Sequence, residues 1–324
     1  MPNPPAVSGS VLVMRGESVL LETHHGLADA TAGTPCSART RFQLASVSKQ
    51  ITATAVLQLV ERGALGLDDP LDRWFAGSPE SWRGITTHHL LAHTSGIGHW
   101  REYPMLDLTA PMDPDELLRV FADVPPLFVA GAGWHYSSPG FVLLAHLVQR
   151  AADEPYRDYL DRMVFTPLGM TRTFAGMPHG RDDLARGYLD DEPVRSFELD
   201  VVGMGAGDVW STVGDMQTWL AAVRPDGDGD SRSAGHPLGP ETRRLMVARH
   251  AATGRGTDES GYGYGWFLGS LAGEEWVHHS GENAGFRAFD AWSARSDRRV
   301  VMLSNQDRTD ATAVTAILTG TAGH

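Results

Sequence analysis

Ser46 and Lys49 stand three positions apart in the stretch "FQLASVSKQ", where a helical pattern begins. Residues i and i+3 share one face of a helix, so the lysine amine can reach the serine hydroxyl. Free N–H groups and the positive dipole end at a helix start would also stabilise a negatively charged oxygen. The pair predicts a nucleophilic serine with an activating amine. A helix cap followed by a solvated lysine is the alternative, because Ser-x-x-Lys often arises by chance.

Two later segments carry side chains suited to proton transfer and substrate binding. In "GWHYSSPG", Tyr136 precedes an expected helix, and Ser138 is its expected N-cap. In "WVHHSGENAGF", His279, Ser280 and Gly281 stand at the end of an expected strand. Each also has a structural interpretation: ring packing for Tyr136, capping for Ser138 and burial at a strand end for His279.

The order of these three segments resembles the serine β-lactamase and penicillin-binding-protein superfamily, in which a Ser-x-x-Lys motif precedes two further motifs. The tyrosine element resembles the class C β-lactamase-like branch, with its esterase and D-alanyl-D-alanine carboxypeptidase relatives. Further stretches similar to that branch extend the resemblance over nearly the whole chain: "GALGLDDPLDRWF", "ITTHHLLAHTSGI", "FTPLGMTRT", "GAGDVWSTVGDMQTWL" and "YGYGWFLG".

The resemblance implies a role for each matching residue. Ser46 would form the acyl-enzyme, Lys49 would help to activate it, and Tyr136 would exchange protons with nucleophile and leaving group. Whether Lys49 or Tyr136 is the general base in each step stays open. The implied oxyanion hole and substrate-binding residues are Ser46, Glu282, Ser138, His279, Ser280 and Gly281, with the backbone N–H groups of Ser46 and Glu282 as oxyanion donors. The chemistry needs no cofactor and no metal.

Two departures from the family pattern narrow the expected activity. His279 stands where many β-lactamases have lysine, and a mostly neutral imidazole is a weaker carboxylate anchor. Ser138 stands where an asparagine would offer two amide N–H donors. The sequence therefore favours a serine hydrolase acting on small carboxylic esters, amides or peptides. The alternatives are an acyltransferase or D-amino-acid peptidase or amidase of secondary metabolism, a weak β-lactamase, and a non-catalytic sensor.

Other chemistry-bearing residues fit less well. Ser95 in "LAHTSGI" lacks the Gly-x-Ser-x-Gly elbow of α/β-hydrolases. The histidine pairs at 24–25, 88–89 and 278–279 lack carboxylates at ligand spacing. The loop "DGDGDS" lacks the glycine and glutamate of a calcium loop. Trp100 and Tyr103 are expected at the cavity entrance.

The elements that must position these residues follow from periodicity and turn signals. A hairpin turns at residues 15–17. Helices are expected over 46–62 with Gly63 as the stop, over 141–150 after Pro139 as first residue, over 155–165 and from Val213. The expected strands cover 264–271, 275–279, 286–292 and 299–304, and a closing helix covers 311–318.

This pattern predicts an α+β fold with a β-lactamase-like antiparallel sheet flanked by helices. Residues 1–71 and 201–324 would form the sheet subdomain, and residues 72–200 a mainly helical inserted subdomain. The chain has 324 residues, 42% of them hydrophobic, and a net charge of -13. That charge argues against nucleic acid or an anionic membrane as a partner. The single cysteine, Cys36, excludes an intrachain disulfide, and no apolar run or signal-like start is seen, so a cytoplasmic location is expected. The oligomeric state cannot be read from the sequence.

Overall fold

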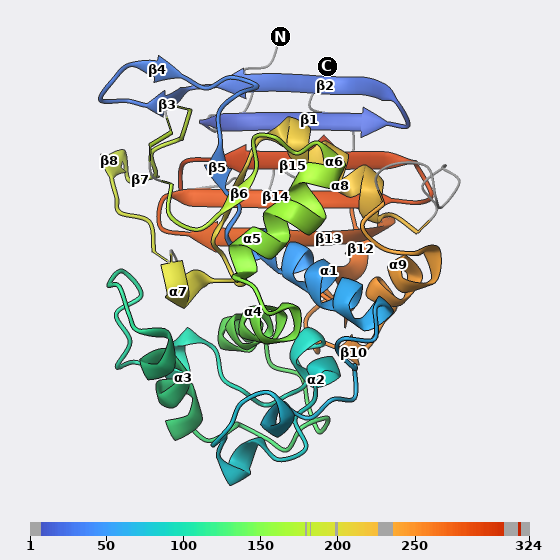
Figure 1. The fold of residues 1–324 in the computed structure, drawn as a ribbon. Helices are drawn as coiled ribbons and strands as arrows, with labels where there is room; N and C mark the ends of the chain where they lie inside the picture. The colour runs from blue at the N-terminus through green and yellow to red at the C-terminus, as the bar shows by residue number, and fades with distance from the viewer. Residues whose placement is uncertain are drawn as a thin grey trace.

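An eight-stranded antiparallel sheet is built from segments near the two ends of the chain (Figure 1). The computed structural model describes residues 8–178, 180–181, 183–197, 200–225, 236–307 and 317–318. The strand order is β10-β11-β12-β13-β14-β15-β1-β2. The strands are β1 (Gly9–Arg15), β2 (Ser18–His25), β10 (Ala251–Ala252), β11 (Gly261–Tyr262), β12 (Phe267–Leu271), β13 (Glu274–Asn283), β14 (Phe286–Ser293) and β15 (Arg298–Ser304).

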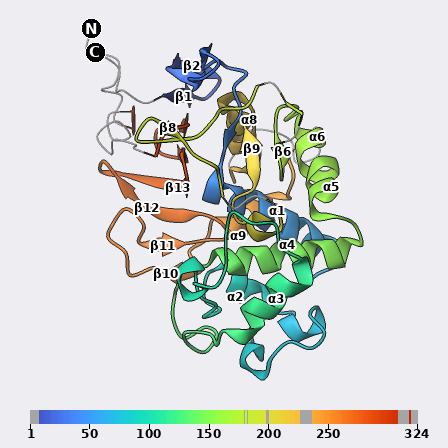
Figure 2. The same ribbon diagram turned by 90° about the vertical axis from the view of Figure 1, so that its left-hand side faces the viewer.

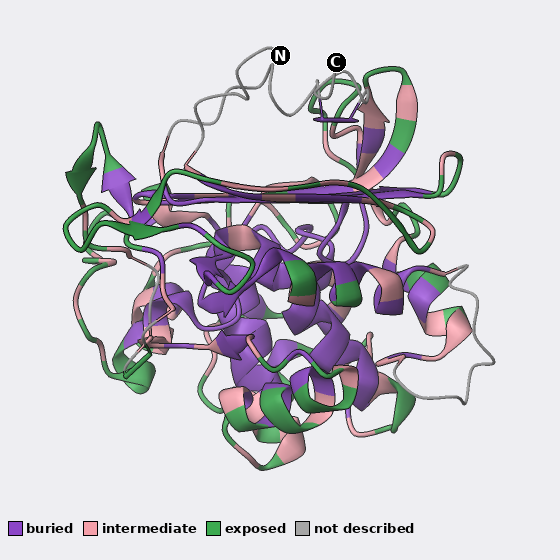
Figure 3. Ribbon diagram, turned by 90° about the horizontal axis from the view of Figure 1, so that it is seen from above, coloured by how far each residue is buried: buried purple, intermediate pink, exposed green. Residues whose placement is uncertain are grey.

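The two faces of the sheet bury different side chains. Alternate residues of a strand point to opposite faces, so Leu12, Val301 and Leu303 join the large core beneath the helices, whereas Val13 and Val300 join a smaller cluster on the other face. Viewed along the sheet, the buried helices lie against one face (Figure 3). The predicted α+β architecture is confirmed.

Helix α1 (Ser48–Glu61) runs through the centre of the molecule and is buried from Ser48 to Leu59. A helix without an exposed face is a core helix, and its polar side chains need partners. The Thr52 hydroxyl donates to the Gly205 carbonyl at 2.6 Å, and the Gln58 amide donates to the Met163 carbonyl at 3.0 Å. Gly63 follows with a positive φ of 70°, which ends the helix as expected.

The other elements surround α1 and continue away from the sheet. In the side view, strands at the β10 end of the sheet lie near α2 (Figure 2). The remaining helices are α2 (Thr87–Leu91), α3 (Pro114–Asp123), α4 (Ser138–Ala152), α5 (Tyr156–Leu160), α6 (Thr166–Leu168), α7 (Asp200–Gly203), α8 (Val213–Val223) and α9 (Pro240–Met246). Short strands form three small sheets: β3 (Leu27–Asp29) with β4 (Thr34–Pro35), β7 (Tyr188–Leu189) with β8 (Glu192–Pro193), and β9 (Val209–Ser211) between β5 (Phe42–Gln43) and β6 (Phe174–Ala175).

Several element boundaries differ from the expectations. The strand expected over 264–271 begins at Phe267, because the residues before it form β11 and a turn. The strand expected over 275–279 continues to Asn283. The helix expected over 155–165 passes into a π-helical turn at Asp161. Most of the expected closing helix, residues 311–316, lies outside the described residues. The subdomain boundaries stay a prediction. No helix among the described residues is long and apolar enough to cross a membrane.

A buried carboxyl group joins the sheet to the central helix. Gln50 of α1 donates to Asp290 of β14 at 2.6 Å and accepts from the Trp219 indole at 2.9 Å. Burial raises the pKa of Asp290 to about 8, against the opposing effect of the Gln50 hydrogen bond. The folded protein therefore holds a proton that the unfolded chain releases.

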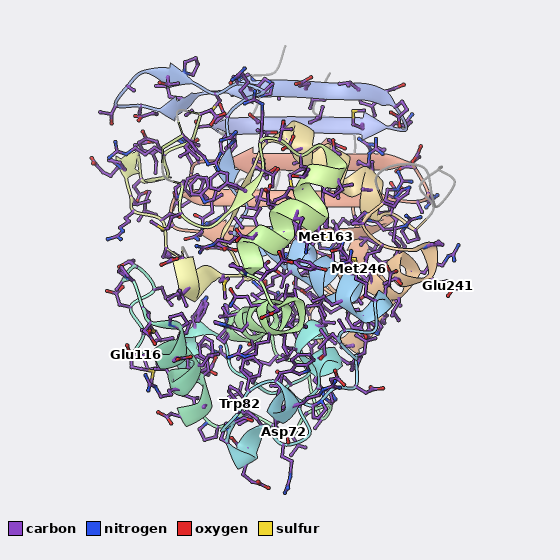
Figure 4. All side chains as sticks on the ribbon, in the orientation of Figure 1. Asp72, Trp82, Glu116, Met163, Glu241 and Met246 are labelled. Atoms are coloured by element: carbon purple, nitrogen blue, oxygen red, sulfur yellow. The ribbon has the colours of Figure 1, made fainter. Side chains whose placement is uncertain are left out.

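We expect this proton to make stability pH-dependent. With the folded pKa above the unfolded one, the stabilising contribution is complete below about pH 4 and is lost as pH rises to about 8. Asp290→Asn removes that titration, so the variant's Tm should rise relative to wild type between about pH 5 and pH 8. Thermal unfolding across this range checks it. Asp72→Asn, at an exposed position far from the sheet (Figure 4), is the control. A constant Tm difference for Asp290→Asn would contradict the prediction.

Candidate active site

Ser46 lies in a 3-10 turn, Ala45–Val47, immediately before α1. Ala45 has a φ of 47°, in the left-handed region that residues with a Cβ rarely occupy. Backbone strain of this kind is often found at functional sites, where the surrounding structure holds it. The turn leaves Ser46 partly exposed at the wall of a cavity, while Ala45 and Val47 are buried.

The Lys49 side chain is fully buried and lies directly behind Ser46. Its ammonium donates to Ser46 Oγ at 2.9 Å, to Ser138 Oγ at 3.1 Å and to the Ala206 carbonyl at 2.9 Å. These acceptors equal in number the N–H donors of an ammonium group. Lys49 is also the only lysine in the whole sequence. The predicted i, i+3 contact is therefore present, and the solvated-lysine alternative is wrong.

Tyr136 and Ser138 enter the site from the segment that leads into α4. The Lys49 ammonium lies 4.9 Å from the centre of the Tyr136 ring. The expectation that Ser138 is the N-cap is wrong: Ser137 accepts the hydrogen bond from Gly140 N–H at 2.9 Å and caps the helix. Ser138 is instead the first residue of α4. This shift by one position directs its hydroxyl to Lys49.

A cavity of about 580 Å³ brings the predicted residues together. Six of them line it: Ser46, Tyr136, Ser138, His279, Ser280 and Glu282. Lys49 and Gly281 are buried and are not among the lining residues. Aromatic rings form much of the remaining wall, from Trp100, Trp134, Phe197 and Phe267. The cavity therefore offers an apolar surface beside the serine hydroxyl, as small-molecule sites commonly do.

Gly281 lets strand β13 approach the turn that carries Ser46. A Cβ at this position would lie 2.1 Å from the Leu44 carbonyl oxygen and 3.2 Å from the Ala45 Cβ. Only a residue without a side chain fits this contact. The glycine of the third motif therefore sets the distance between the strand and the nucleophile turn.

His279 is 1% exposed, and its ring has a partner at each nitrogen. Nε2 lies 3.3 Å from Tyr262 Oη, and Nδ1 lies 2.6 Å from the Ser280 carbonyl. Burial, followed by the nearby Lys49 ammonium, lowers the pKa of His279 well below 6.5. The imidazole is therefore neutral at pH 7.

Several cavity residues were not predicted. His99 accepts the Ser138 N–H at Nδ1 (3.2 Å), and burial together with Lys49 lowers its pKa to about 4. The Arg255 guanidinium lies 5.4 Å from the Trp134 ring and binds Glu259 at 2.5 Å. His93 and Tyr262 lie behind these residues. His93 stands two positions before Ser95, in a stretch that resembles the family but to which the sequence assigns no site residue.

Ser95 is buried and does not line the cavity; its Oγ accepts the Ile97 N–H at 3.2 Å. Among the described residues, no group of three or more His, Cys, Asp or Glu could hold a metal ion. The "DGDGDS" loop lies outside the described residues. Trp100 lines the cavity as expected, but the placement of Tyr103 is wrong: it is 2% exposed and packs on Phe121 with ring centres 5.3 Å apart.

Comparison with solved structures identifies the architecture. The penicillin-binding protein from Bacillus halodurans has a TM-score of 0.83 and 27% identity, covering 97% of this chain and 96% of its own. The D-amino acid amidase from Ochrobactrum anthropi SV3 shares the fold, with a TM-score of 0.81 and 24% identity over 98% and 94% of the two chains. The protein therefore has the fold of penicillin-binding proteins and β-lactamases. The Beta-lactamase family model matches residues 5–320, and the chain belongs to this family.

Two proteins similar in sequence to this chain are an esterase and a penicillin-binding protein. Esterase EstB of Burkholderia gladioli is 41% identical over 180 residues, which is 51% of this chain and 46% of the relative. Penicillin-binding protein 4* of Bacillus subtilis (strain 168) is 32% identical over 204 residues, which is 59% and 44%. The matches span a little under half the length of these two relatives.

Proposed function

We propose that the chain is a serine hydrolase that acts on small carboxylic esters or amides through an acyl-enzyme on Ser46. The observation that carries the proposal is the Lys49 ammonium, buried and 2.9 Å from Ser46 Oγ at the wall of the cavity. In acylation, the serine oxygen bonds to the acyl carbon as the bond to the leaving group breaks. The serine proton passes to the member of the Lys49–Tyr136 pair that is deprotonated when substrate reacts, a neutral amine or a phenolate, and from there to the departing alcohol or amine. Water then attacks the acyl-enzyme and releases the acid.

The open edge of β13 supports an oxyanion hole at Glu282. Strand β12 pairs with β13 no further than His278, so among the described residues no strand lies beside the edge from His279 onward. Asn283 and Phe286 pair across a two-residue connection, which requires them to exchange ladder hydrogen bonds with each other. Because strand N–H directions alternate, those of Ser280 and Glu282 face the open edge. A donor there and the Ser46 N–H would stabilise the oxyanion.

The site favours esters and amides over β-lactams that carry a carboxylate. The neutral His279 ring supplies no permanent cation at the position of the third motif. The Ser138 hydroxyl already accepts from Lys49 and lacks an amide donor. The similarity to an esterase over half of the chain points the same way. Aromatic walls suit an acyl group that is apolar or aromatic.

Mass spectrometry after brief exposure to a fluorophosphonate or a p-nitrophenyl ester tests the proposal. We expect one adduct on Ser46 and none in Ser46→Ala. A serine hydroxyl is a weak nucleophile unless a neighbouring base activates it, and Lys49 lies beside Ser46. Ser95→Ala is the matched control and should keep the adduct, since this serine does not line the cavity. An unmodified Ser46 with full ester turnover would reject the mechanism. Added amines then separate transfer from hydrolysis, by the amide they form.

We also propose a cytoplasmic location. The single cysteine leaves the fold independent of an intrachain disulfide, and therefore of an oxidising compartment. Fractionation of cells that produce the untagged protein tests this, and recovery of the protein outside the cytoplasmic fraction would contradict it.

A further inference from the structure

Three buried side chains form a continuous hydrogen-bonded bridge beside Tyr136. His93 Nε2 lies 3.2 Å from Tyr262 Oη, and the same Oη lies 3.3 Å from His279 Nε2. Each of the three residues is at most 1% exposed. The His93 and Tyr136 rings lie 4.5 Å apart. We call these three residues the imidazole–phenol bridge.

Each end of the bridge holds the backbone of a segment that carries site residues. His93 accepts the His135 N–H at its carbonyl (2.9 Å) and the Ser137 N–H at Nδ1 (3.1 Å). One residue thus fixes both neighbours of Tyr136. At the other end, His279 Nδ1 lies 2.6 Å from the Ser280 carbonyl on the open edge of β13.

The partners at the two ends determine where every proton of the bridge lies. A backbone N–H can only donate, so His93 Nδ1 accepts from Ser137 and the neutral ring carries its proton on Nε2. That proton goes to Tyr262 Oη, whose own proton goes to His279 Nε2. His279 must then carry its proton on Nδ1, where the Ser280 carbonyl accepts it. The two imidazoles therefore have opposite tautomers.

The surroundings favour this uncharged arrangement. Burial, followed by the Lys49 ammonium, lowers the pKa values of His93 and His279 well below 6.5. The neighbouring titratable and charged groups also lower these pKa values. His99 and His135 lower the pKa of His93, and His278 and Arg255 lower the pKa of His279. Burial raises the pKa of Tyr262 well above 10. A protonated His93 would also turn an N–H toward the Ser137 N–H and break that end of the bridge.

We propose that the imidazole–phenol bridge is a positioning device that fixes the distance between Tyr136 and the open edge of β13. It connects the segment that carries Tyr136 to strand β13 through hydrogen bonds between uncharged groups. Each group donates to the next, from the Ser137 N–H to the Ser280 carbonyl, and none of the three residues transfers a proton to substrate. The role rests on the proposed acyl-enzyme chemistry at Ser46. It assigns His93 and Tyr262, which lie outside the three motifs, to the support of catalysis.

Nitrogen-15 NMR of histidine-labelled protein tests the bridge without any activity. We expect His93 protonated on Nε2 and His279 on Nδ1, with neither ring titrating from about pH 5.5 to pH 8. In Tyr262→Phe, the Ser280 carbonyl should keep the His279 proton on Nδ1, and the His279 Nε2 resonance should shift because it loses the hydrogen bond from the Tyr262 hydroxyl. Titration of either ring in wild type within this range, or the same tautomer for both, would overturn the proposal, whatever the outcome at Ser46.

Steady-state kinetics with a p-nitrophenyl ester test the positioning role. Tyr262→Phe keeps the ring and removes one hydroxyl, so kcat should fall about 10- to 100-fold with KM within about two-fold. Tyr264→Phe is the matched control: its hydroxyl bonds to His88 Nδ1 at 2.7 Å, outside the cavity. It removes an equivalent tyrosine–histidine hydrogen bond and should leave kcat unchanged. An unchanged kcat in Tyr262→Phe, or an equal loss in Tyr264→Phe, would overturn the role.

Discussion

Lys49→Met should lower kcat/KM for an activated ester by about 10²- to 10⁴-fold, the usual contribution of a positioned acid–base group. The methionine side chain has similar length and no proton to exchange. The amine at 2.9 Å from Ser46 Oγ is lost, so the Lys49–Tyr136 pair that exchanges the serine proton loses one of its two members. Stopped-flow measurement of the first product released reports the acylation rate directly.

Stability should respond differently from activity in this variant. Removing a buried cation is often neutral or stabilising, but the Ala206 carbonyl loses its donor, at a cost of about 1–3 kcal/mol. We expect a folded protein with a small change in Tm. Lys49→Arg separates charge from proton transfer, because a guanidinium stays charged. Activity of Lys49→Arg within about ten-fold of wild type would contradict a base role for the amine.

Gly281→Ala should lower kcat/KM by about 10²-fold, although the added methyl group is not in the cavity. Its Cβ would lie 2.1 Å from the Leu44 carbonyl, so β13 must move away from the nucleophile turn. That movement takes the open edge of the strand from the position where it would bind the oxyanion. Overpacking of this kind also costs about 1–3 kcal/mol of stability.

The control for this change is Gly214→Ala in the first turn of α8. An added Cβ there meets its nearest atom, Thr212 Oγ1, at 3.9 Å. Alanine favours a helix over glycine by about 1 kcal/mol, so Tm should hold or rise and activity should stay. If Gly281→Ala behaved like Gly214→Ala in both ester turnover and thermal unfolding, the close approach of β13 would not matter.

The local parts of the site could be predicted from the sequence, because they depend on spacing along one element. Ser46 and Lys49 share a helix face at i and i+3, and hydrophobic periodicity places the strands close to their observed bounds. The motif order that resembles the family added Tyr136 and the 279–282 segment. Their meeting around one cavity is a property of the fold.

The remaining parts depend on contacts between distant segments, for which a single sequence has no signal. His93 and Tyr262 are separated by 169 positions and meet through buried side chains. The sequence could not distinguish Ser137 from Ser138 as the N-cap of α4, because either serine can cap a helix. In the structure Ser137 caps the helix, and the Ser138 hydroxyl accepts a hydrogen bond from Lys49 instead. The position of Tyr103 could not be predicted because aromatic residues occur both in cavity walls and in hydrophobic cores. Tyr103 is buried in the core.

Lys49 is the only lysine in the sequence, and all other residues counted as Lys or Arg are arginines. Its side-chain amine can therefore report on the protonation state of the site without signals from other lysines. Feeding the producing cells lysine enriched in carbon-13 at Cε would place a single labelled group in the chain, next to the nucleophile. Its chemical shift would follow the protonation of that amine through acylation and release, with no neighbouring resonance to resolve. The same scarcity means that coupling chemistries aimed at lysine would find no exposed lysine side chain, because Lys49 is fully buried.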